Sequence, residues 1–453
     1  MTVTPLRRNG DAPPVRLAHL GLGAFHRSHQ AWWTGAVGRS DPWGIAAFTG
    51  RGPAAAVPLA AQGGLYTLIV RGARADRAEV VTAISRAADG SDTAAFAACL
   101  ADPAVRVLTV TVTEAGYCRD ADGALDRADP GVAADLAALT AGDGGPLRTA
   151  PGRVVAGLRA RCRADAGPLA VVPCDNLAAN GSALRRVVMD LAGQADPGLA
   201  GWIDGSVSFV STAVDRITPR ATPADRDTAT RLTGRSDRAP VVTEPFREWV
   251  LAGDFPGGRP PWEEAGARFT RDVTSYEDRK LWLLNGAHSI LAYGGLLRGH
   301  ETVAAAFADG TCRGWVREWW AEAARHLPQP AGTLAAYQES LAGRFANPRI
   351  RHTLAQVAAD GTQKLRMRAV PILRRERAAG RPGTAALRMI ACWIAYLRGH
   401  QAEPADPMAA RLRLTRRPRD LLALIAPDLA EDGTVLAGLA ELVAENEKGR
   451  RPR

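Results

Sequence analysis

Hydrophobic and polar positions follow two different patterns along the chain. Over the first 270 residues, short apolar runs end in glycine or polar turns, which predicts buried strands alternating with helices. Beyond a glycine- and proline-rich segment, 252–262, apolar residues recur at helical spacing and the strand–helix alternation does not return. The pattern therefore predicts an α/β domain over residues 1–270 and a mostly α-helical domain over 271–453. The runs interpreted as strands are 15–23, 43–48, 65–70, 80–84, 105–113, 169–173 and 207–214.

A helix predicted over 276–299 carries a concentrated set of reactive polar residues. With Lys280 at zero and 100° per residue, Glu277 falls at about 60°, His288 at about 80° and Asn285 at about 140°. All four residues then occupy less than half of the helix circumference. A proton acceptor, an amide and an imidazole on one face suit oxidation at a C–OH group. A solvated helix face with a few polar residues gives the same spacing, so the pattern alone leaves both readings open.

The first predicted strand runs into a glycine turn and a helix. Gly21 and Gly23 lie between the strand and the predicted helix that begins at Ala24. In this arrangement free backbone N–H groups at the helix start point at a phosphate, which makes Gly21, Gly23, Ala24 and Phe25 candidate cofactor contacts. The third glycine of the usual dinucleotide pattern is missing, and a lone G-x-G also occurs in ordinary turns.

The loop after the second strand bears on the choice of cofactor. A dinucleotide-binding unit usually has an acidic residue there that binds the ribose 2′-hydroxyl. This chain has Arg51 as the single charge in the segment TGRGPAA. An arginine can pair with a 2′-phosphate, and it can equally be an exposed loop residue. The prediction is NAD, with NADP possible because of Arg51.

Three later strands also end in polar loops. Thr113, Glu114 and Gly116 follow the strand 105–113, Asn176 follows 169–173, and Asp215 follows 207–214. The carboxyl ends of parallel strands form the ligand crevice of α/β folds. Thr113, Glu114 and Gly116 are therefore candidate cofactor contacts. Each residue alone fits a turn or a helix cap, so it is the recurrence that indicates a shared site.

The amino-acid composition argues against several classes of protein. The net charge of +10 is spread along all 453 residues without a basic run, and aromatics make up only 6%, which argues against nucleic-acid binding. A basic surface does attract anionic cofactors or sugar acids. Six scattered cysteines without a C-x-x-C pair argue against a zinc site and suit a reducing cytoplasm. Without a long uncharged apolar run, no membrane association is expected.

Seven motifs in order along the chain carry a family resemblance. The sequence resembles the polyol-specific long-chain dehydrogenases, the family of mannitol 2-dehydrogenase and fructuronate reductase. This resemblance implies a Rossmann-type N-terminal domain, a mostly helical C-terminal domain and an active site in the cleft between them. It also implies a metal-independent, monomeric, nicotinamide-dependent enzyme. The motifs are GLGAFHRSHQA at 21–31, LTVTVTEAGYC at 108–118, VVPCDNLAANG at 171–181, VDRITP at 214–219, TEPFREWVL at 243–251, LWLLNGAHS at 281–289 and DGTQKL at 360–365.

The resemblance also assigns roles to individual residues. It implies that Lys280 is the general base and that two asparagines polarise the reacting oxygen. A histidine orients the substrate, a glutamate leads protons to solvent, and an aspartate contacts the substrate. In this numbering these partners of Lys280 are Asn176, Asn285, His288, Glu277 and Asp215.

The chain departs from the mannitol dehydrogenases near the DG-x-x-K motif. They carry an arginine eight residues before its lysine; here the lysine is Lys364 and that position is Gln356. Fructuronate reductases resemble this chain instead, with the pair Arg351-His352 upstream and Arg368 downstream. Such a cationic cluster suits a substrate carboxylate, although a basic helix face would look the same. D-mannonate and D-fructuronate are thus the expected substrates. A neutral polyol such as mannitol or arabinitol is the alternative, and a nucleotide-binding regulator without turnover is a third hypothesis.

Overall fold

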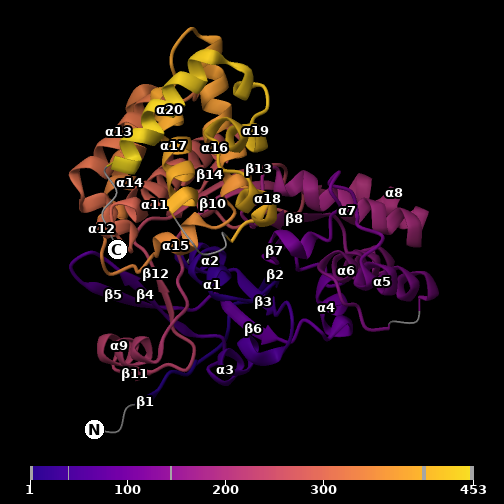
Figure 1. Ribbon diagram of the computed structural model, residues 1–453. Helices are drawn as coiled ribbons and strands as arrows, with labels where there is room; N and C mark the ends of the chain where they lie inside the picture. The colour runs from indigo at the N-terminus through magenta and orange to yellow at the C-terminus, as the bar shows by residue number, and fades with distance from the viewer. Residues whose placement is uncertain (1–3, 39, 143–144, 400–404, 449–453) are drawn as a thin grey trace. The chain divides into compact units, whose positions relative to one another are not determined.

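The chain divides into two compact units, Met1–Thr274 and Ser275–Arg453. The computed structural model describes residues 4–38, 40–142, 145–399 and 405–448 (Figure 1). The predicted boundary at residue 270 lies just before the end of the first unit. Each unit is described by itself below, and the predicted cleft between them stays a prediction.

A parallel sheet of six strands organises the first unit (Figure 1). Numbered along the chain, its strands lie in the spatial order 3-2-1-4-5-6, which is the order of a Rossmann fold. The predicted α/β Rossmann-type domain is therefore confirmed. Across the sheet the strands are β6 (Ile84–Ala88), β3 (Gly44–Phe48), β2 (Val15–Leu20), β7 (Val107–Val110), β8 (Leu169–Pro173) and β9 (Val207–Phe209).

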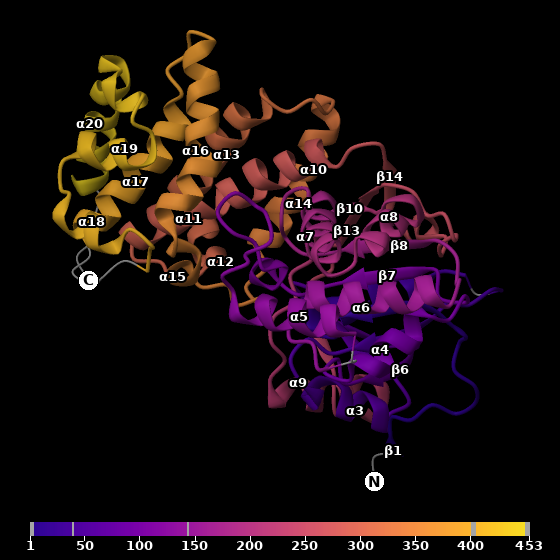
Figure 2. The ribbon, with the colours of Figure 1, turned by 90° about the vertical axis from the view of Figure 1, so that its right-hand side faces the viewer.

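Both faces of this sheet are buried, which explains why its strands look like continuous apolar runs. Along β3, Ala46 and Phe48 belong to one hydrophobic core, while Ile45 and Ala47 belong to the other. Successive side chains of a strand point to opposite faces, so each strand contributes to both cores. Helices α4 and α6 cover the first face (Figure 2). Three tryptophans, Trp33, Trp249 and Trp262, fill the core on the second face.

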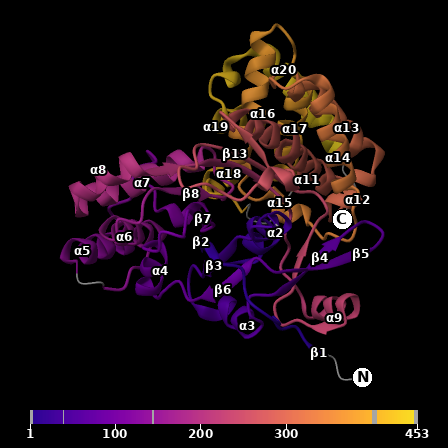
Figure 3. The same ribbon diagram turned by 180° about the vertical axis from the view of Figure 1, so that it is seen from behind.

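Smaller sheets and further helices complete the first unit. Helix α9 packs beside β4 and β5 (Figure 3). The smaller sheets are β1 (Thr4–Pro5) with β11 (Arg235–Ser236), β12 (Val241–Thr243) with β4 (Tyr66–Arg71) and β5 (Asp76–Val81), and β10 (Ser211–Asp215) with β13 (Glu248–Ala252) and β14 (Arg268–Thr270). The helices are α1 (Ala24–Ser28), α2 (Gln30–Ala36), η1 (Pro53–Ala55), α3 (Ala56–Ala61), α4 (Thr93–Leu100), η2 (Glu114–Tyr117), α5 (Pro130–Ala141), α6 (Ala150–Arg163), α7 (Asn180–Ala195), α8 (Pro197–Ser206), α9 (Pro223–Thr233) and η3 (Trp262–Ala265).

Two predicted strands are each divided between two sheets. The run 207–214 forms β9 in the six-stranded sheet and then β10, which pairs with β13 in a different sheet. The change occurs at Val210, whose N–H donates to the carbonyl of Val171 before the next residue pairs with Ala252. Asp215 therefore ends a strand of the smaller sheet. The run 80–84 is divided in the same way between β5 and β6.

The described regular elements of the second unit are all helices, as predicted. Its central helix is α11, whose side chains are buried on nearly every face (Figure 1). A helix that is apolar all round belongs in a core, and α12, α13, α15 and α17 pack around it. The helices are α10 (Thr274–Arg279), η4 (Lys280–Gly286), α11 (Ala287–Leu297), α12 (Val303–Ala308), α13 (Gly310–Ala324), α14 (Ala331–Phe345), α15 (Leu354–Ala358), α16 (Gly361–Ala378), α17 (Thr384–Gly399), α18 (Ala409–Leu414), α19 (Pro418–Ile425), η5 (Leu429–Glu431) and α20 (Gly433–Lys448).

The apolar pattern fails to predict α16, the helix that carries Lys364 and Arg368. Its many arginines and the internal Pro371 interrupt the regular spacing of apolar residues that would indicate a helix. The preceding helix, α15, covers only Leu354–Ala358, and the chain before it is irregular. The cationic residues of the DG-x-x-K region therefore lie on a helix that the pattern does not reveal.

Two observations bear on the expected surroundings of the protein. All six cysteines are free thiols in the structure. None of the described helices combines the length and apolar character that crossing a lipid bilayer requires.

A buried carboxylate ties three segments of the helical unit together. Glu376 on α16 accepts hydrogen bonds from Arg381, Arg325 and His326, at 2.8, 2.6 and 2.5 Å. These bonds, that from Arg381 above all, lower the pKa of Glu376 to about 2 from its ordinary value of 4.5. The ionised carboxylate therefore stabilises the folded protein.

Replacing Glu376 should destabilise the protein in a pH-dependent manner. Glu376→Gln should lower the free energy of unfolding by about 1.5–3 kcal/mol at pH 7, because the buried carboxylate loses its charge-assisted hydrogen bonds. Since the folded pKa is depressed, the contribution is complete above the ordinary pKa and is lost as the pH falls toward 2. Denaturant unfolding from pH 7 to pH 3 should show the difference shrinking. Glu445→Gln, which breaks an exposed pair with Arg388, is the control. A pH-independent difference would contradict the assignment.

Candidate functional site

The helix predicted over 276–299 is divided by a π-helix. Residues Lys280–Gly286 form η4, between α10 and α11. A π-helix bonds i to i+5 and is rare outside functional sites. The predicted wheel positions, calculated at 100° per residue, are therefore wrong across this segment. Because the bonded residues of a π-helix are five apart, Lys280 and Asn285 lie closer to one face than the α-helical estimate of about 140°.

The four residues predicted on this helix lie in consecutive elements. Glu277 lies on α10, Lys280 opens η4, Asn285 lies near its end, and His288 is in the first turn of α11. Glu277, Lys280 and Asn285 are half-buried, and His288 is buried. The arrangement places an amine and an amide where solvent and a ligand can reach them, next to an imidazole within the core.

Cationic side chains from separate segments meet beside His288. Its ring lies 4.9 Å from the ring of His352, which precedes α15. Lys364 and Arg368 face the same region from successive turns of α16, and Arg344 from α14 adds a further charge. Among the described residues, no carboxylate lies within ion-pair distance of Lys364 or Arg368. The cationic cluster is defined here as His288, Arg344, His352, Lys364 and Arg368. Within it, Lys364 and Arg368 place two like charges close together in a partly buried position.

Burial and these charges change the protonation of the cluster. Burial, followed by the neighbouring cations, lowers the pKa of His288 well below its ordinary value. Burial and Lys364 lower the pKa of His352, and burial and Arg368 lower the pKa of Lys364. Burial lowers the pKa of Arg368 to about 10, which leaves it charged at neutral pH. An anion bound here would relieve the repulsion between these groups.

Arg368 also has a structural role. Its Nη1 donates to the carbonyl of Asn285 at 2.9 Å and to the hydroxyl of Ser289 at 2.8 Å. Its buried Nε has no hydrogen-bond partner among the residues that the structure describes. Lys364 donates to the carbonyl of Val357 at 3.0 Å. The arginine therefore connects the cationic cluster to the π-helix.

Two residues predicted near the cluster lie on the outer surface. Arg351 is exposed, and so is Gln356, whose side-chain carbonyl accepts a hydrogen bond from Thr353 at 2.9 Å. The predicted contacts of Arg351 and Gln356 with a substrate stay predictions.

In the first unit, the glycine turn lies where the strand order reverses. Gly21 follows β2, the strand from which successive strands are added in opposite directions. Its φ is +109°, and a Cβ there would overlap the carbonyl oxygen of Thr111 beyond β7. Only glycine fits this close approach. Gly23, Ala24 and Phe25 follow at the start of α1 and are half-buried.

His26 occupies the place of the third glycine. Its ring stacks on that of His19, with centroids 3.4 Å apart, inside the core beneath the turn. The His19 ring in turn makes hydrogen bonds with the hydroxyls of Thr109 and Thr111, at 2.8 and 3.1 Å. Burial lowers the pKa of both histidines, so both rings are neutral. The missing glycine therefore reflects a different packing beneath the turn.

The other predicted cofactor residues lie at or near the surface, Arg51 and Thr113 outside regular elements and Glu114 and Gly116 in the short helix η2. Arg51 and Glu114 are exposed, with Glu114 at 3.7 Å from Arg119. Thr113 adopts φ +67°, which an L-residue rarely does, and Gly116 packs closely on Val112.

Hydrogen bonds connect the segment that carries Asn176 with strand β10, which ends at Asp215. Asn176 is exposed after β8, and Asp215 is buried at the end of β10. The buried Asn180 amide donates to the carbonyls of Asp175 and Thr212, at 3.1 and 2.8 Å. This amide fixes the end of β8 against β10, although the two strands belong to different sheets.

Comparison with known proteins identifies the family. Residues 15–264 match the mannitol dehydrogenase Rossmann domain and residues 272–431 match the mannitol dehydrogenase C-terminal domain. D-mannonate oxidoreductase of Escherichia coli is 36% identical over 415 residues, which cover 88% of this chain and 84% of that protein. Mannitol 2-dehydrogenase of Cereibacter sphaeroides is 35% identical over 446 residues, covering 94% and 92%.

The chain belongs to the mannitol dehydrogenase family.

A solved structure supports the same assignment. The Pseudomonas fluorescens mannitol 2-dehydrogenase, a ternary complex with NAD and D-mannitol, has a TM-score of 0.77 and 33% sequence identity. The match covers 98% of this chain and 93% of that one. The predicted resemblance is confirmed, and so is the expectation of an oxidoreductase that acts on CH–OH groups.

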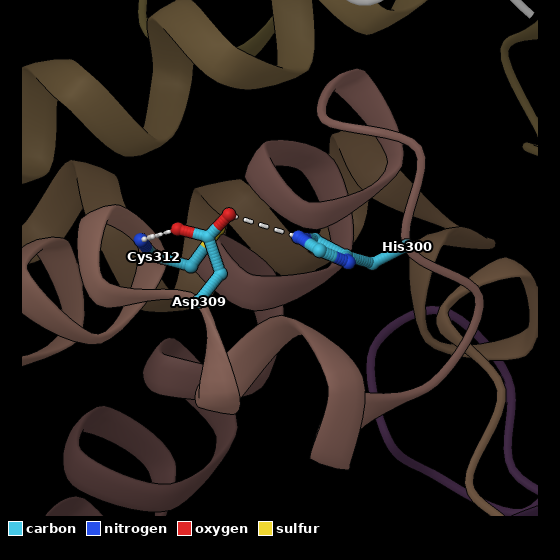
Figure 4. A group of neighbouring side chains, drawn as sticks. All are labelled: His300, Asp309 and Cys312. Atoms are coloured by element: carbon cyan, nitrogen blue, oxygen red, sulfur yellow. Dashed lines mark hydrogen bonds and ion pairs between the residues drawn. The ribbon is translucent and has the colours of Figure 1, made fainter.

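Three neighbouring side chains of the helical unit carry atoms that can bind a metal ion. His300, Asp309 and Cys312 lie close together around the start of α13 (Figure 4). Asp309 caps the helix, accepting from the N–H groups of Thr311 and Cys312, and its other oxygen lies 3.0 Å from both Arg298 and His300. Burial raises the pKa of the Cys312 thiol to about 12. An arginine on the carboxylate and a protonated thiol fit a helix cap better than a metal site.

Asp175 is the residue that the sequence analysis missed. Its buried carboxylate accepts hydrogen bonds from the N–H of Thr113 at 2.8 Å, from the N–H of Val112 at 3.0 Å and from the hydroxyl of Tyr117 at 3.1 Å. Burial raises the pKa of Asp175, and the two N–H groups oppose that rise. An aspartate between a strand and Asn176 could have suggested a loop anchor. Its partners, however, lie about sixty residues earlier in the chain.

Removing this anchor should loosen the loop after β7. Asp175→Asn should speed amide hydrogen exchange over 112–117 and lower the free energy of unfolding by about 1–2 kcal/mol, because a neutral amide oxygen accepts the two N–H groups more weakly than a carboxylate, and an NH2 group replaces the oxygen that accepts from Tyr117. Mass-spectrometric exchange and denaturant unfolding measure the two effects. Asp204→Asn, which breaks an exposed pair with Arg185, should leave that exchange unchanged. Unaltered exchange in Asp175→Asn would contradict the anchoring role.

Proposed function

We propose that this protein is a nicotinamide-dependent dehydrogenase that interconverts a sugar acid and its keto form, with D-mannonate and D-fructuronate as the expected pair. The cationic cluster around His288 and Arg368 supports this proposal most directly. Lys364 and Arg368 have no ion-pair partner among the described residues, and a carboxylate is the anion that arginine binds well. The family relative D-mannonate oxidoreductase acts on a substrate of this class by name.

The first unit has the features of a dinucleotide site. Gly21 has a positive φ and lies directly against the backbone of Thr111, in the turn where the strand order reverses. A Rossmann fold binds the phosphates of its dinucleotide at this turn. Residues that would hold the cofactor are Gly21, Gly23, Ala24, Phe25, Thr113, Glu114 and Gly116. When bound, the nicotinamide accepts a hydride from the carbinol carbon or returns it. NAD is the proposed cofactor, and the exposed Arg51 supports NADP as the alternative.

Lys280 is proposed as the general base. A lysine ordinarily has a pKa of about 10.4, so a neutral amine near pH 7 requires removal of water around it. In the oxidation direction its amine takes the hydroxyl proton as the hydride leaves the carbon. Asn176 and Asn285 would donate hydrogen bonds to the developing alkoxide, as an oxyanion hole does.

The remaining residues would position the substrate and move protons. His288, neutral in its buried place, would orient the substrate hydroxyl, and Glu277 would pass the proton from Lys280 to solvent. Asp215 would hold a further hydroxyl group. Lys364, Arg368 and His352 would bind the carboxylate, with Arg351 and Gln356 at the outer edge.

Removing the amine tests this mechanism. Lys280→Ala should lower kcat by about a thousandfold or more, because no other group then takes the proton. Binding of the dinucleotide, followed by the fluorescence of bound NADH, should stay close to that of the unaltered protein. Wild-type turnover in this variant would exclude Lys280 as the base.

A neutral polyol is the second candidate substrate. Mannitol 2-dehydrogenase of Cereibacter sphaeroides matches 94% of this chain, which supports that alternative. The purified protein can be assayed with NADH and NADPH against fructuronate, tagaturonate, fructose and xylulose. Fructuronate should give the highest kcat/KM. No absorbance change with any of these compounds would favour a regulator without turnover.

Arg368 should distinguish an acid from a polyol. Arg368→Ala should raise the KM for fructuronate at least about tenfold, because a hydrogen bond to a charged group contributes about 1.5–3 kcal/mol. Its structural bonds to Asn285 and Ser289 affect both substrate classes, so the informative quantity is the ratio of the KM changes for fructuronate and fructose. Arg366→Ala, an exposed arginine on the same helix, is the matched control. Equal changes for both substrates would contradict a carboxylate site.

The scattered free cysteines also support a reducing, cytoplasmic location. We further propose that the enzyme acts as a monomer.

A further inference from the structure

The π-helix η4 is held by side chains from neighbouring helices. The indole N–H of Trp319 donates to the carbonyl of Trp282 at 2.7 Å, and that of Trp320 donates to the carbonyl of Leu283 at 2.8 Å. Both bonds are buried, and both tryptophans lie on α13. With Arg368 on the carbonyl of Asn285, three carbonyls of one short π-helix accept side-chain donors.

Packing reinforces these hydrogen bonds. A Cβ at Gly286, the last residue of η4, would lie 2.5 Å from Nε1 and 2.6 Å from Cζ2 of Trp319. The φ of Gly286 is −63°, so its backbone conformation does not require glycine. Glycine is required here because the indole ring lies directly against the backbone. Trp319 thus contacts η4 through both a hydrogen bond and its ring.

The winding of η4 decides how the proposed catalytic groups face one another. An α-helix turns by about 100° per residue and the wider π-helix turns by less, so rewinding η4 as an α-helix would rotate the chain before it relative to the chain after it. Lys280 lies at the start of η4, and His288 lies beyond its end. A change to α-helical winding would therefore turn the Lys280 amine away from Asn285 and His288.

We propose that Trp319 and Trp320 are positioning residues, whose indole N–H groups keep η4 wound as a π-helix and so aim Lys280 at the substrate. The inference rests on the proposed role of Lys280 as the base. Neither tryptophan is assigned a contact with substrate or cofactor.

The experiment compares matched tryptophan-to-phenylalanine variants of α13. Phenylalanine keeps much of the ring and removes the N–H donor, so W319F/W320F tests the hydrogen bonds more than the packing. The control is W315F, because the ring of Trp315 packs beside Gly294 of α11, outside η4. All proteins are compared by amide hydrogen exchange over 280–286, by kcat and KM, and by the pH dependence of kcat.

The double variant should show faster exchange over 280–286 and a kcat lowered about 10- to 100-fold, since small misplacements of a catalytic group are costly. The apparent pKa in its kcat profile should shift, because the surroundings of Lys280 change, while the KM for the dinucleotide stays within about threefold. W315F should keep the wild-type exchange and pH profile. Restoring one tryptophan, as in W319F alone, should recover part of the kcat.

Two outcomes would overturn the inference. One is wild-type exchange over 280–286 in W319F/W320F. The other is faster exchange there with an unchanged kcat and pH profile. Neither outcome depends on the Lys280→Ala result, which tests the base itself. An active Lys280→Ala protein would therefore refute the proposed function even if the tryptophans hold the π-helix.

Discussion

The winding of seven residues, Lys280–Gly286, is the constraint on which the proposed chemistry of the helical unit depends. A π-helix is less stable than an α-helix of the same length, so it persists only where neighbours hold it. Here the neighbours are two indole N–H groups and a guanidinium, all directed at backbone carbonyls. The geometry of the proposed base is therefore built into the core of this unit.

The same core also concentrates positive charge. Arg368 supports the π-helix and belongs to the cationic cluster, so one side chain connects the winding of η4 to the electrostatics beside it. Burial, and after it the neighbouring cations, lower the pKa values of His288, His352 and Lys364. An anion bound beside Lys364 and Arg368 would offset their mutual repulsion. The proposal of a sugar acid as substrate, in place of a neutral polyol, rests on this charge.

The Rossmann unit brings loops from distant segments of the chain to one edge of its parallel sheet. Alternating residues of β3 pack into the two hydrophobic cores and hold the sheet between them. The close approach of Gly21 to Thr111 fixes the turn where the strand order reverses. Asp175 and Asn180 then connect the loops after β7, β8 and β10. Buried polar side chains thus hold the loops in place beyond the ends of the strands, where hydrogen bonds between strands stop.

The sequence by itself determined the α/β and helical units and the glycine turn, and it predicted Lys280, Asn285 and His288 as a group. These features depend on local periodicity, on residue type and on ordered motifs, all of which can be observed along the chain. Only the tertiary structure decided the π-helix, because its donors Trp319 and Trp320 lie 37 residues away and leave no local pattern. It also decided that the run 207–214 serves two sheets, that Asp175 anchors a loop, and that α16 brings Arg368 to Asn285. Each of these depends on hydrogen bonds between segments distant in sequence, which residue spacing cannot reveal.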